Sequence, residues 1–510
     1  MEKSEKRSFK LYVSRSGNRE GMKMIKLFDA MDKQLEYNEG SLLRKVPDIS
    51  KSQLSNLKAH LYRQILSSLR MINVGNDIDM QIRELLDYSR ILYNKGLYLQ
   101  SLKILEKAKL LTKETSRNIF YLEVLEFEKV IEAQFITRSI EDRAEILTLE
   151  VNRVLGSVNR ANNYSNLALR LYGLYIKIGH VKDEKEYSVA QKFFKENLPS
   201  GQPSQFSFSE RLYFHIAHAW YYYIVQDFLM YYRHSQKWVQ LYEEFPEMKK
   251  YESNWYLKGI HNLLTSLFIN GHHKPFLEIL SNFEKFIDTN KDKFTMNLRI
   301  VSFLYIYSAK INRYLMEGTF EEGLYLVDEI EEGLKKFGYR IDHHRLLLYY
   351  YKIGCLYFGC GDYENSLKYL NKVINFKDVG LREDIHCFAR ILSLIIHYEL
   401  GDVDKLQYQI KTVYHFLGRM NDINAVQREI IGFLKRSGSM YPQDIKKEFE
   451  ALMKTFEILQ EKPYEKRPFL YLDIISWLKS KIQNTTIQHI IRERFLRTNN
   501  PRRKELPKAS

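Results

Sequence analysis

Apolar side chains recur every three or four residues along most of the chain, in stretches separated by short polar turns. A stretch of this kind before Gly361 places its apolar residues on one face, and a second stretch after Gly361 does the same. The residues involved are Tyr350, Ile353, Gly354 and Tyr357 before the turn, and Leu367, Leu370, Val373 and Ile374 after it. This period is typical of amphipathic helices, so the pattern predicts an all-α protein built from helix pairs.

The turn between two paired helices carries a recurring signal: glycine, any residue, an aromatic residue, two more residues, a small residue and leucine. Gly361–Leu367, Gly96–Leu102 and Gly318–Leu324 follow it, and Gly271–Leu277 is a looser copy. By spacing, further turns are predicted at Ser139, Gly179, Gln226 and Gly401. These eight pivots lie about 44 residues apart, which is typical of a repeat array. Glycine at a pivot allows a left-handed turn, and the small residue allows the second helix to pack closely.

The unit around Gly361 resembles a tetratricopeptide repeat (TPR), and so does the unit around Gly96. The resemblance rests on Tyr350, Ile353, Gly354, Tyr357, Gly361, Tyr363, Ser366, Leu370 and Val373. It differs in two respects, because these units are about ten residues longer than the standard 34-residue repeat and Asp378 replaces the closing proline. The resemblance implies an α-solenoid of antiparallel helix pairs, with HEAT-like pairs as an alternative.

The pattern predicts four segments. Residues 1–75 form a basic helical segment, either a cap or a helix-turn-helix-like unit, and residues 76–436 form the TPR-like array. Residues 437–498 form a C-terminal helical cap, because the last unit of a solenoid would otherwise expose its apolar face. Residues 499–510 form a basic disordered tail.

Composition supports a globular helical protein. The 510 residues include only 23 glycines and 10 prolines, fewer turn formers than a large β-sandwich or barrel needs. Three cysteines exclude a disulfide scaffold and indicate a reducing compartment. The N-terminus carries charges throughout, and no apolar run approaches the length of a membrane span. We therefore expect a soluble, cytoplasmic protein that does not enter a membrane.

The net charge of +15 is concentrated at the two ends. Residues 1–75 hold 15 Lys and Arg against 8 Asp and Glu, and residues 463–510 hold 11 against 4. The interior, residues 76–462, is nearly neutral, with 52 against 51. Basic ends of this kind contact phosphates or an acidic partner, or simply remain solvated.

Arrays that resemble TPR proteins bind extended peptides in a concave groove lined by their first helices. If the resemblance holds, groove residues lie three, six and ten positions before each pivot. The candidates for partner binding are Tyr93, Trp220, Tyr223, Phe268, Asn312 and Phe358. An aromatic groove would suit an apolar or helical segment of a partner. The alternative interpretation is that the same side chains only pack one repeat against the next.

The N-terminal segment contains a second candidate site. Residues 18–34, 38–46 and 51–72 are predicted helices, with Ser50 or Ser52 capping the third. The stripe opposite the apolar face of that helix includes Arg63 and Arg70, with Lys51 and Lys58 at its flanks, so this side of the helix is basic. A short helix, a tight turn and a basic helix are compatible with nucleic-acid binding. A plain capping bundle has the same pattern.

Catalytic motifs are absent from the sequence: there is no P-loop, GxSxG or HExxH. His215 and His218 lack an acidic residue at ligand spacing, and Cys355 and Cys360 lie on different faces of one helix. We expect no enzyme, metal or cofactor. The main hypothesis is a scaffold that binds a protein or peptide partner. The alternative is a bacterial-type regulator that combines a nucleic-acid-binding N-terminus with a ligand-sensing array.

Overall fold

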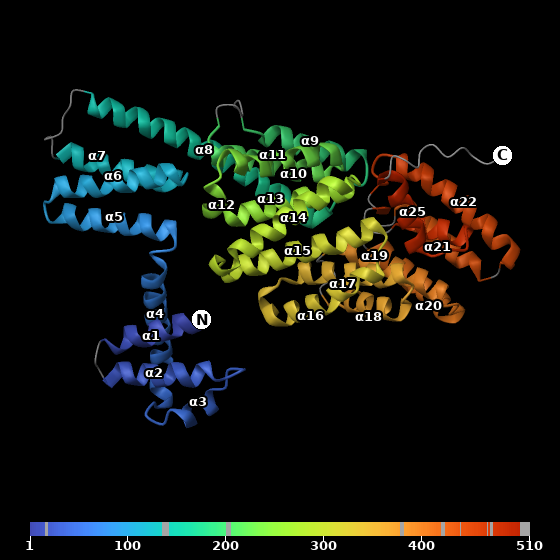
Figure 1. The fold of residues 1–510 in the computed structure, drawn as a ribbon, viewed down its shortest axis with the longest axis horizontal. Helices are drawn as coiled ribbons and strands as arrows, with labels where there is room; N and C mark the ends of the chain where they lie inside the picture. Colours follow the sequence, from blue (N-terminus) through green and yellow to red (C-terminus); the bar gives the residue numbers. More distant parts are fainter. Residues whose placement is uncertain are drawn as a thin grey trace. The chain divides into compact units, whose positions relative to one another are not determined.

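The structure, a computed structural model, shows only helices as regular elements in the residues that it describes (Figure 1), so the prediction of an all-α protein is confirmed. It describes residues 1–15, 19–134, 142–199, 206–377, 382–419, 424–438, 440–466, 468–469 and 473–499. The predicted pivot at Ser139, residue Asp378 and the predicted tail beyond Asn499 lie outside these ranges. Within them, no helix combines the length and the apolar character that crossing a bilayer requires.

The chain divides into two units, residues 1–158 and 159–510. The division falls inside helix α8 (Arg143–Ile178). The predicted pairing places two helices between the pivots at 139 and 179, and α8 differs from this prediction. One continuous helix of 36 residues fills the described part of that interval instead. No proline interrupts residues 143–178, so nothing in the sequence forces a break.

The first four helices of unit 1 form a small bundle with its own core. They are α1 (Lys3–Ser14), α2 (Arg19–Asp32), α3 (Glu39–Lys45) and α4 (Lys51–Asn73). Ser50 begins α4 in a reciprocal capping arrangement with Gln53, as the sequence predicts for this residue. Helix α1 was not predicted, and its Phe9 and Val13 are buried in the core of the bundle. Residues 1–75 therefore have enough apolar surface to pack among themselves.

The rest of unit 1 consists of α5 (Ile78–Asn94), α6 (Tyr98–Glu114), α7 (Asn118–Gln134) and the start of α8. Helices α5, α6 and α7 lie side by side in Figure 1, and α6 packs on both of its neighbours. The small residue of the turn signal acts as predicted, because the Ser101 hydroxyl donates to the carbonyl oxygen of Ser89 on α5 at 2.9 Å.

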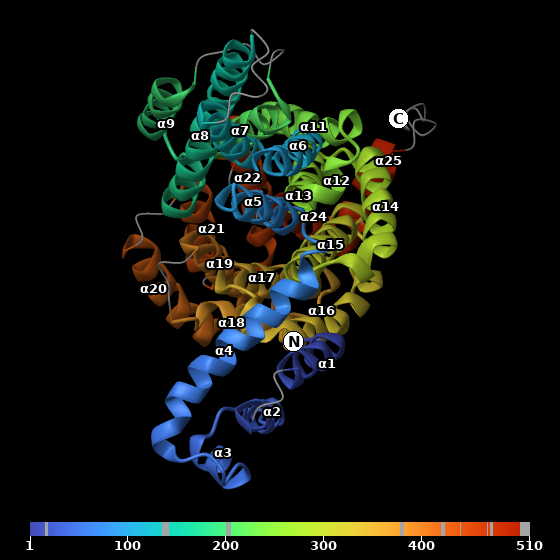
Figure 2. The ribbon, with the colours of Figure 1, turned by 90° about the vertical axis from the view of Figure 1, so that its left-hand side faces the viewer.

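Unit 2 continues with helix pairs that follow one another along a curved path (Figures 1 and 2). The pairs are the end of α8 with α9 (Glu184–Asn197), α10 (Phe208–Ile224) with α11 (Phe228–Glu244), α13 (Ser253–Ile269) with α14 (His273–Asn290), α15 (Met296–Glu317) with α16 (Tyr325–Phe337), α17 (His343–Cys360) with α18 (Tyr363–Ile374), and α19 (Glu383–Glu399) with α20 (Val403–Arg419). The short helix α12 (Met248–Tyr251) precedes α13. Helices α13, α15, α17 and α19 contact one another in series, so the first helices of successive pairs form a continuous layer.

The described residues after α20 include the helices α21 (Ala425–Ser437), α22 (Pro442–Glu461), α24 (Ile474–Ile482) and α25 (Ile487–Asn499). Helix α24 packs on α22, and α25 packs on α15 and α17. Trp477 of α24 is fully buried, and its indole nitrogen donates to Glu399 Oε1 at 2.6 Å. The C-terminal helices therefore cover apolar surface of the preceding helices, and α25 does so on α15 and α17 rather than on the last pair.

Each of the seven described pivots has a backbone φ in the left-handed region and lies between two paired helices. The residues are Gly96, Gly179, Gln226, Gly271, Gly318, Gly361 and Gly401. Gln226, at φ 61°, shows that the spacing located a turn even where glycine is absent. At Gly354, a Cβ atom would lie 3.0 Å from Leu370 Cδ2, which explains why the two helices of this pair need a small residue there.

We expect Gly318→Ala to destabilise unit 2 more than Gly401→Ala does. Both glycines have positive φ, 64° and 69°, so each substitution strains the backbone by about 1 kcal/mol. A Cβ atom at Gly318 would also lie 2.5 Å from the backbone nitrogen of Arg492 in α25, whereas the space around Gly401 is open. Denaturant unfolding of the two variants measures the difference. Equal losses would show that α25 does not pack against this turn.

Candidate functional site

Unit 2 contains a cavity of about 950 Å³, lined by side chains from α8, α10, α13, α15, α17 and the C-terminal helices. This volume is at the upper end of the range for ligand-binding pockets. Because its wall comes from the first helices of successive pairs, the cavity lies where the sequence predicts a groove. The cavity is the strongest candidate for a functional site in the described part of the chain.

Five of the six predicted groove residues line this cavity: Trp220, Tyr223, Phe268, Asn312 and Phe358. Trp220, Tyr223 and Phe268 are partly exposed, so a ligand could touch them. Asn312 and Phe358 are only 5% and 4% exposed, and they mainly pack neighbouring helices. The structure thus brings the predicted residues together, but their role in partner binding stays a prediction.

The sixth residue, Tyr93, lies in unit 1 and does not line the cavity. Its ring packs against Tyr98 and Phe127, and its hydroxyl donates to Gln134 at 2.5 Å. This arrangement joins α5 to α7. For this residue the packing interpretation describes the observed contacts.

One wall of the cavity is aromatic. The ring of Trp220 lies 5.0 Å from that of Tyr172 and 5.5 Å from that of Tyr175. Lys258 Nζ on α13 approaches the rings of Tyr172, Trp220 and Trp255 at 5.7, 5.9 and 5.1 Å. A cation over aromatic rings is stabilised by their negative faces. Burial, followed by the nearby Arg345, lowers the pKa of Lys258 to about 8.

A second lysine also lines the cavity. Lys352 Nζ on α17 donates to Ser308 Oγ and to Asn312 Oδ1, both at 2.7 Å and both from α15. The described residues supply no carboxylate to this ammonium group. Burial therefore lowers the pKa of Lys352 to about 7, because desolvation disfavours the charged form. Lys352 is charged in only part of the molecules at neutral pH.

His261 lies near both lysines, and their charges affect its pKa. Its imidazole stacks on Tyr305, with ring centroids 4.2 Å apart. Burial, followed by the positive charges of Lys352, Arg345 and Lys258, lowers the pKa of His261 to about 3. These three cations therefore act on the same region of the cavity, and His261 is neutral there.

Sequence reasoning missed Lys258, Arg345 and Lys352, although a signal for one of them was present. The groove positions were taken as three, six and ten residues before each pivot. Continuing the same helical face by one more step reaches thirteen residues before Gly271, which is Lys258. Lys352 lies nine residues before Gly361, next to the expected groove position ten residues before it. The helix face that lines the cavity is therefore wider than predicted.

The predicted basic stripe on α4 is only partly free. Lys58 donates to the Tyr37 hydroxyl at 2.8 Å, and Arg70 forms an ion pair with Asp87 at 3.0 Å. Lys51 and Arg63 are exposed. Half of the proposed nucleic-acid contacts are thus engaged within unit 1, and the arrangement does not favour nucleic-acid binding over a capping bundle.

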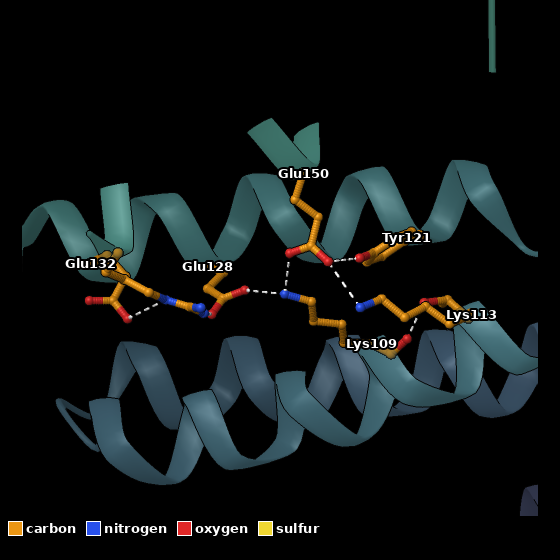
Figure 3. A network of polar contacts seen from close by, with 8 residues as sticks. Lys109, Lys113, Tyr121, Glu128, Glu132 and Glu150 are labelled. Carbon is orange, nitrogen blue, oxygen red and sulfur yellow. Dashed lines mark hydrogen bonds and ion pairs between the residues drawn. The ribbon is translucent and has the colours of Figure 1, made fainter. Parts of the chain in front are cut away.

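A buried polar network in unit 1 was also not predicted (Figure 3). Lys109 on α6 lies between Glu128 and Glu150, with Nζ 2.6 Å from Glu150 Oε2 and 3.5 Å from Glu128 Oε2. Burial alone would raise the pKa of Glu150, but hydrogen bonds from Lys109, Tyr121 and Lys113 outweigh it and lower the pKa to about 2. Every one of these groups has a partner, so the network fits a structural role that joins α6, α7 and α8.

The histidines and cysteines singled out in the sequence also have structural surroundings. His215 Nδ1 lies 3.2 Å from His234 Nδ1, and the ring of His218 stacks on that of His234. Cys355, Cys360 and Cys387, all in the described ranges, form no disulfide. In the described ranges, no group of three or more His, Cys, Asp or Glu side chains is arranged to hold a metal ion.

Comparison with known proteins adds no identification. No protein-family model matches the chain, and no curated protein matches it. The function has to be inferred from the cavity, from the regular turns and from the chemistry of the residues described above.

Proposed function

We propose that the chain is a TPR-like scaffold, an α-solenoid of antiparallel helix pairs that binds a peptide segment of a protein partner in the cavity of unit 2. One observation carries the proposal: five of the six candidate residues chosen from positions at a fixed distance before the pivots line the same cavity. The left-handed pivots and the continuous layer of first helices support the solenoid assignment. An array of this kind offers a long surface with its strongest contacts at aromatic residues.

The proposal is stoichiometric binding rather than catalysis. A nucleophilic lysine needs a general acid or base within hydrogen-bond distance of the reacting atoms. The partners of Lys352 Nζ are Ser308 and Asn312, which do not titrate. These contacts hold the ammonium group in place without moving a proton. We also propose a cytoplasmic location, because three cysteines that form no disulfide suit a reducing compartment.

Affinity capture with matched variants tests the proposal. Trp220→Ala removes the central ring of the aromatic wall, and we expect it to weaken capture of the partner from a lysate of the source cell by roughly tenfold or more. Leu229→Ala is the control, because Leu229 is 52% exposed and does not line the cavity. Thermal unfolding checks that both variants fold. A folded Trp220→Ala variant that retains all partners of the wild type would contradict the proposal.

A further inference from the structure

The cavity of unit 2 has more positive than negative charge. Six of its lining residues are cationic and three are acidic. Two of the acidic residues already have partners, because Asp342 pairs with Arg345 and Asp473 with Arg494. Lys258, Lys352 and Lys479 have no carboxylate partner among the residues that the structure describes. Buried charges are normally paired. An anionic group that binds in the cavity would therefore supply these lysines with the partner that they lack.

Neighbouring groups hold Lys258 on α13 and Lys352 on α17 in place within the cavity. Lys258 lies over three aromatic rings. Three oxygen atoms of α15 hold Lys352 in place: Ser308 Oγ and Asn312 Oδ1 at 2.7 Å, and the Ser308 carbonyl oxygen at the longer distance of 3.4 Å. Each ammonium group has three donor hydrogens, and these contacts do not neutralise its charge. An oxyanion brought between α13 and α17 would gain charge-assisted hydrogen bonds without requiring the lysines to move far.

The surroundings of the lysines indicate what kind of anion fits. Tyr172, Trp220 and Tyr223 form an aromatic surface next to Lys258. A small inorganic anion would pair with the lysines but leave this surface uncovered. A peptide that carries both carboxylate and apolar side chains would cover both. The chemistry of the wall therefore favours an acidic peptide with an apolar residue beside the acidic one.

We propose that the cavity recognises its peptide through acidic side chains, with Lys258 and Lys352 as the groups that pair with the carboxylates. This inference rests on the proposed function, since it names the class of segment that the cavity takes. Arg345 adds to the positive field at the cavity, because it acts on His261 together with both lysines. Of the three cavity lysines without a carboxylate partner, we assign specificity to Lys258 and Lys352 because they lie on α13 and α17, whereas Lys479 lies on the C-terminal helix α24.

Binding of this kind takes up a proton. A bound carboxylate favours the charged form of Lys352, whose pKa is about 7 in the free protein, so affinity falls as the pH rises from about 7 to about 9. Lys258, with a pKa of about 8, contributes in the same direction. The other titratable groups near Lys352 stay neutral over this range, because the pKa of His261 is lowered to about 3 and that of Cys355 is raised to about 12. Arg345 remains charged throughout.

A displayed library of random linear peptides, selected on the full chain, tests the inference. The selected peptides should be enriched in Asp and Glu next to aromatic or aliphatic residues. Their affinity, measured by fluorescence anisotropy, should fall roughly ten- to a hundredfold in Lys258→Gln and in Lys352→Gln, because each variant loses a charge-assisted hydrogen bond. Lys274→Gln, at an exposed position of α14 outside the cavity, is the control and should bind like the wild type. Thermal unfolding confirms that each variant folds.

The possible outcomes separate the two proposals. If the selected peptides lose affinity in Trp220→Ala but not in the lysine variants, the cavity binds peptides and the acidic specificity is wrong. If no selected peptide depends on Trp220 or on either lysine, both proposals fail. If glutarate or inorganic phosphate alone displaces the peptides as effectively as an unlabelled peptide does, the lysines form a site for a small anion and the peptide assignment is overturned.

Discussion

Lys109→Met is expected to destabilise unit 1 by about 3 kcal/mol, the lower end of the usual cost of removing one member of a buried ion pair. The substitution keeps the volume of the side chain but removes the cation between Glu128 and Glu150, which are 6% and 13% exposed. Both carboxylates would then have to be desolvated with fewer partners. Lys113 and Tyr121 still contact Glu150, so the loss falls short of that for a fully unpaired charge.

The measurement needs a probe that reports on unit 1. All four tryptophans lie between residues 220 and 477, in unit 2, so tryptophan emission does not follow unit 1 directly. Hydrogen exchange of amides in α6 and α7 does. Lys107→Met on the same helix is exposed and should change stability by no more than about 0.5 kcal/mol. The double variant with Glu150→Gln should recover part of the loss, since it removes the orphaned charge. If the single variant Lys109→Met is as stable as Lys107→Met, the network does not hold α6, α7 and α8 together.

Acidification is expected to destabilise unit 2 by about 4 kcal/mol between pH 7 and pH 5 through His215 and His234 alone. Burial, followed by neighbouring positive groups, lowers their pKa values to about 3 and about 2. The unfolded chain binds protons at these residues below pH of about 6.5, whereas the folded chain does not. The stabilisation is therefore complete above about pH 6.5 and declines by about 1.4 kcal/mol per pH unit for each histidine as the pH falls.

Tryptophan emission during urea unfolding at several pH values measures this effect in unit 2. His234→Gln removes one titrating group and should reduce the pH dependence between about pH 6 and pH 5 by one proton. His415→Gln is the matched control, because His415 is exposed on α20. If His234→Gln and the wild type lose stability with the same slope, the buried histidines do not drive the acid lability.

Much of the helical order could be predicted because turns and apolar stripes are local properties. Gln226 was located by spacing alone, and its left-handed φ shows that the repeat period holds without glycine. The capping residue Ser50 was predicted because N-caps depend on side chains within one turn. Helix α1 was missed because only Phe9 and Val13 mark its buried face within a highly charged segment.

The polar features were harder to predict because they depend on contacts between distant residues. Lys109 meets Glu150 across 41 positions, and Lys352 meets Ser308 across 44. Neither pair has a local signature, since a lysine on a helix usually belongs to a solvated face. The boundary between the two units lies inside an unbroken helix, so no turn signal marks it. Residues that line the cavity could be predicted where they follow the turn period, whereas the contacts of the charged side chains between them could not.

Site-specific photo-crosslinking can show directly whether the cavity of unit 2 is the binding site. A photoreactive phenylalanine analogue replaces Trp220 on the cavity wall or Leu229 on the exposed face of α11, and each protein is irradiated in a lysate of the source cell. We predict that position 220 cross-links to a distinct partner protein, that position 229 does not, and that an acidic peptide selected on the chain suppresses the product. Equal cross-linking at both positions, or a product that the peptide does not suppress, would contradict the claim.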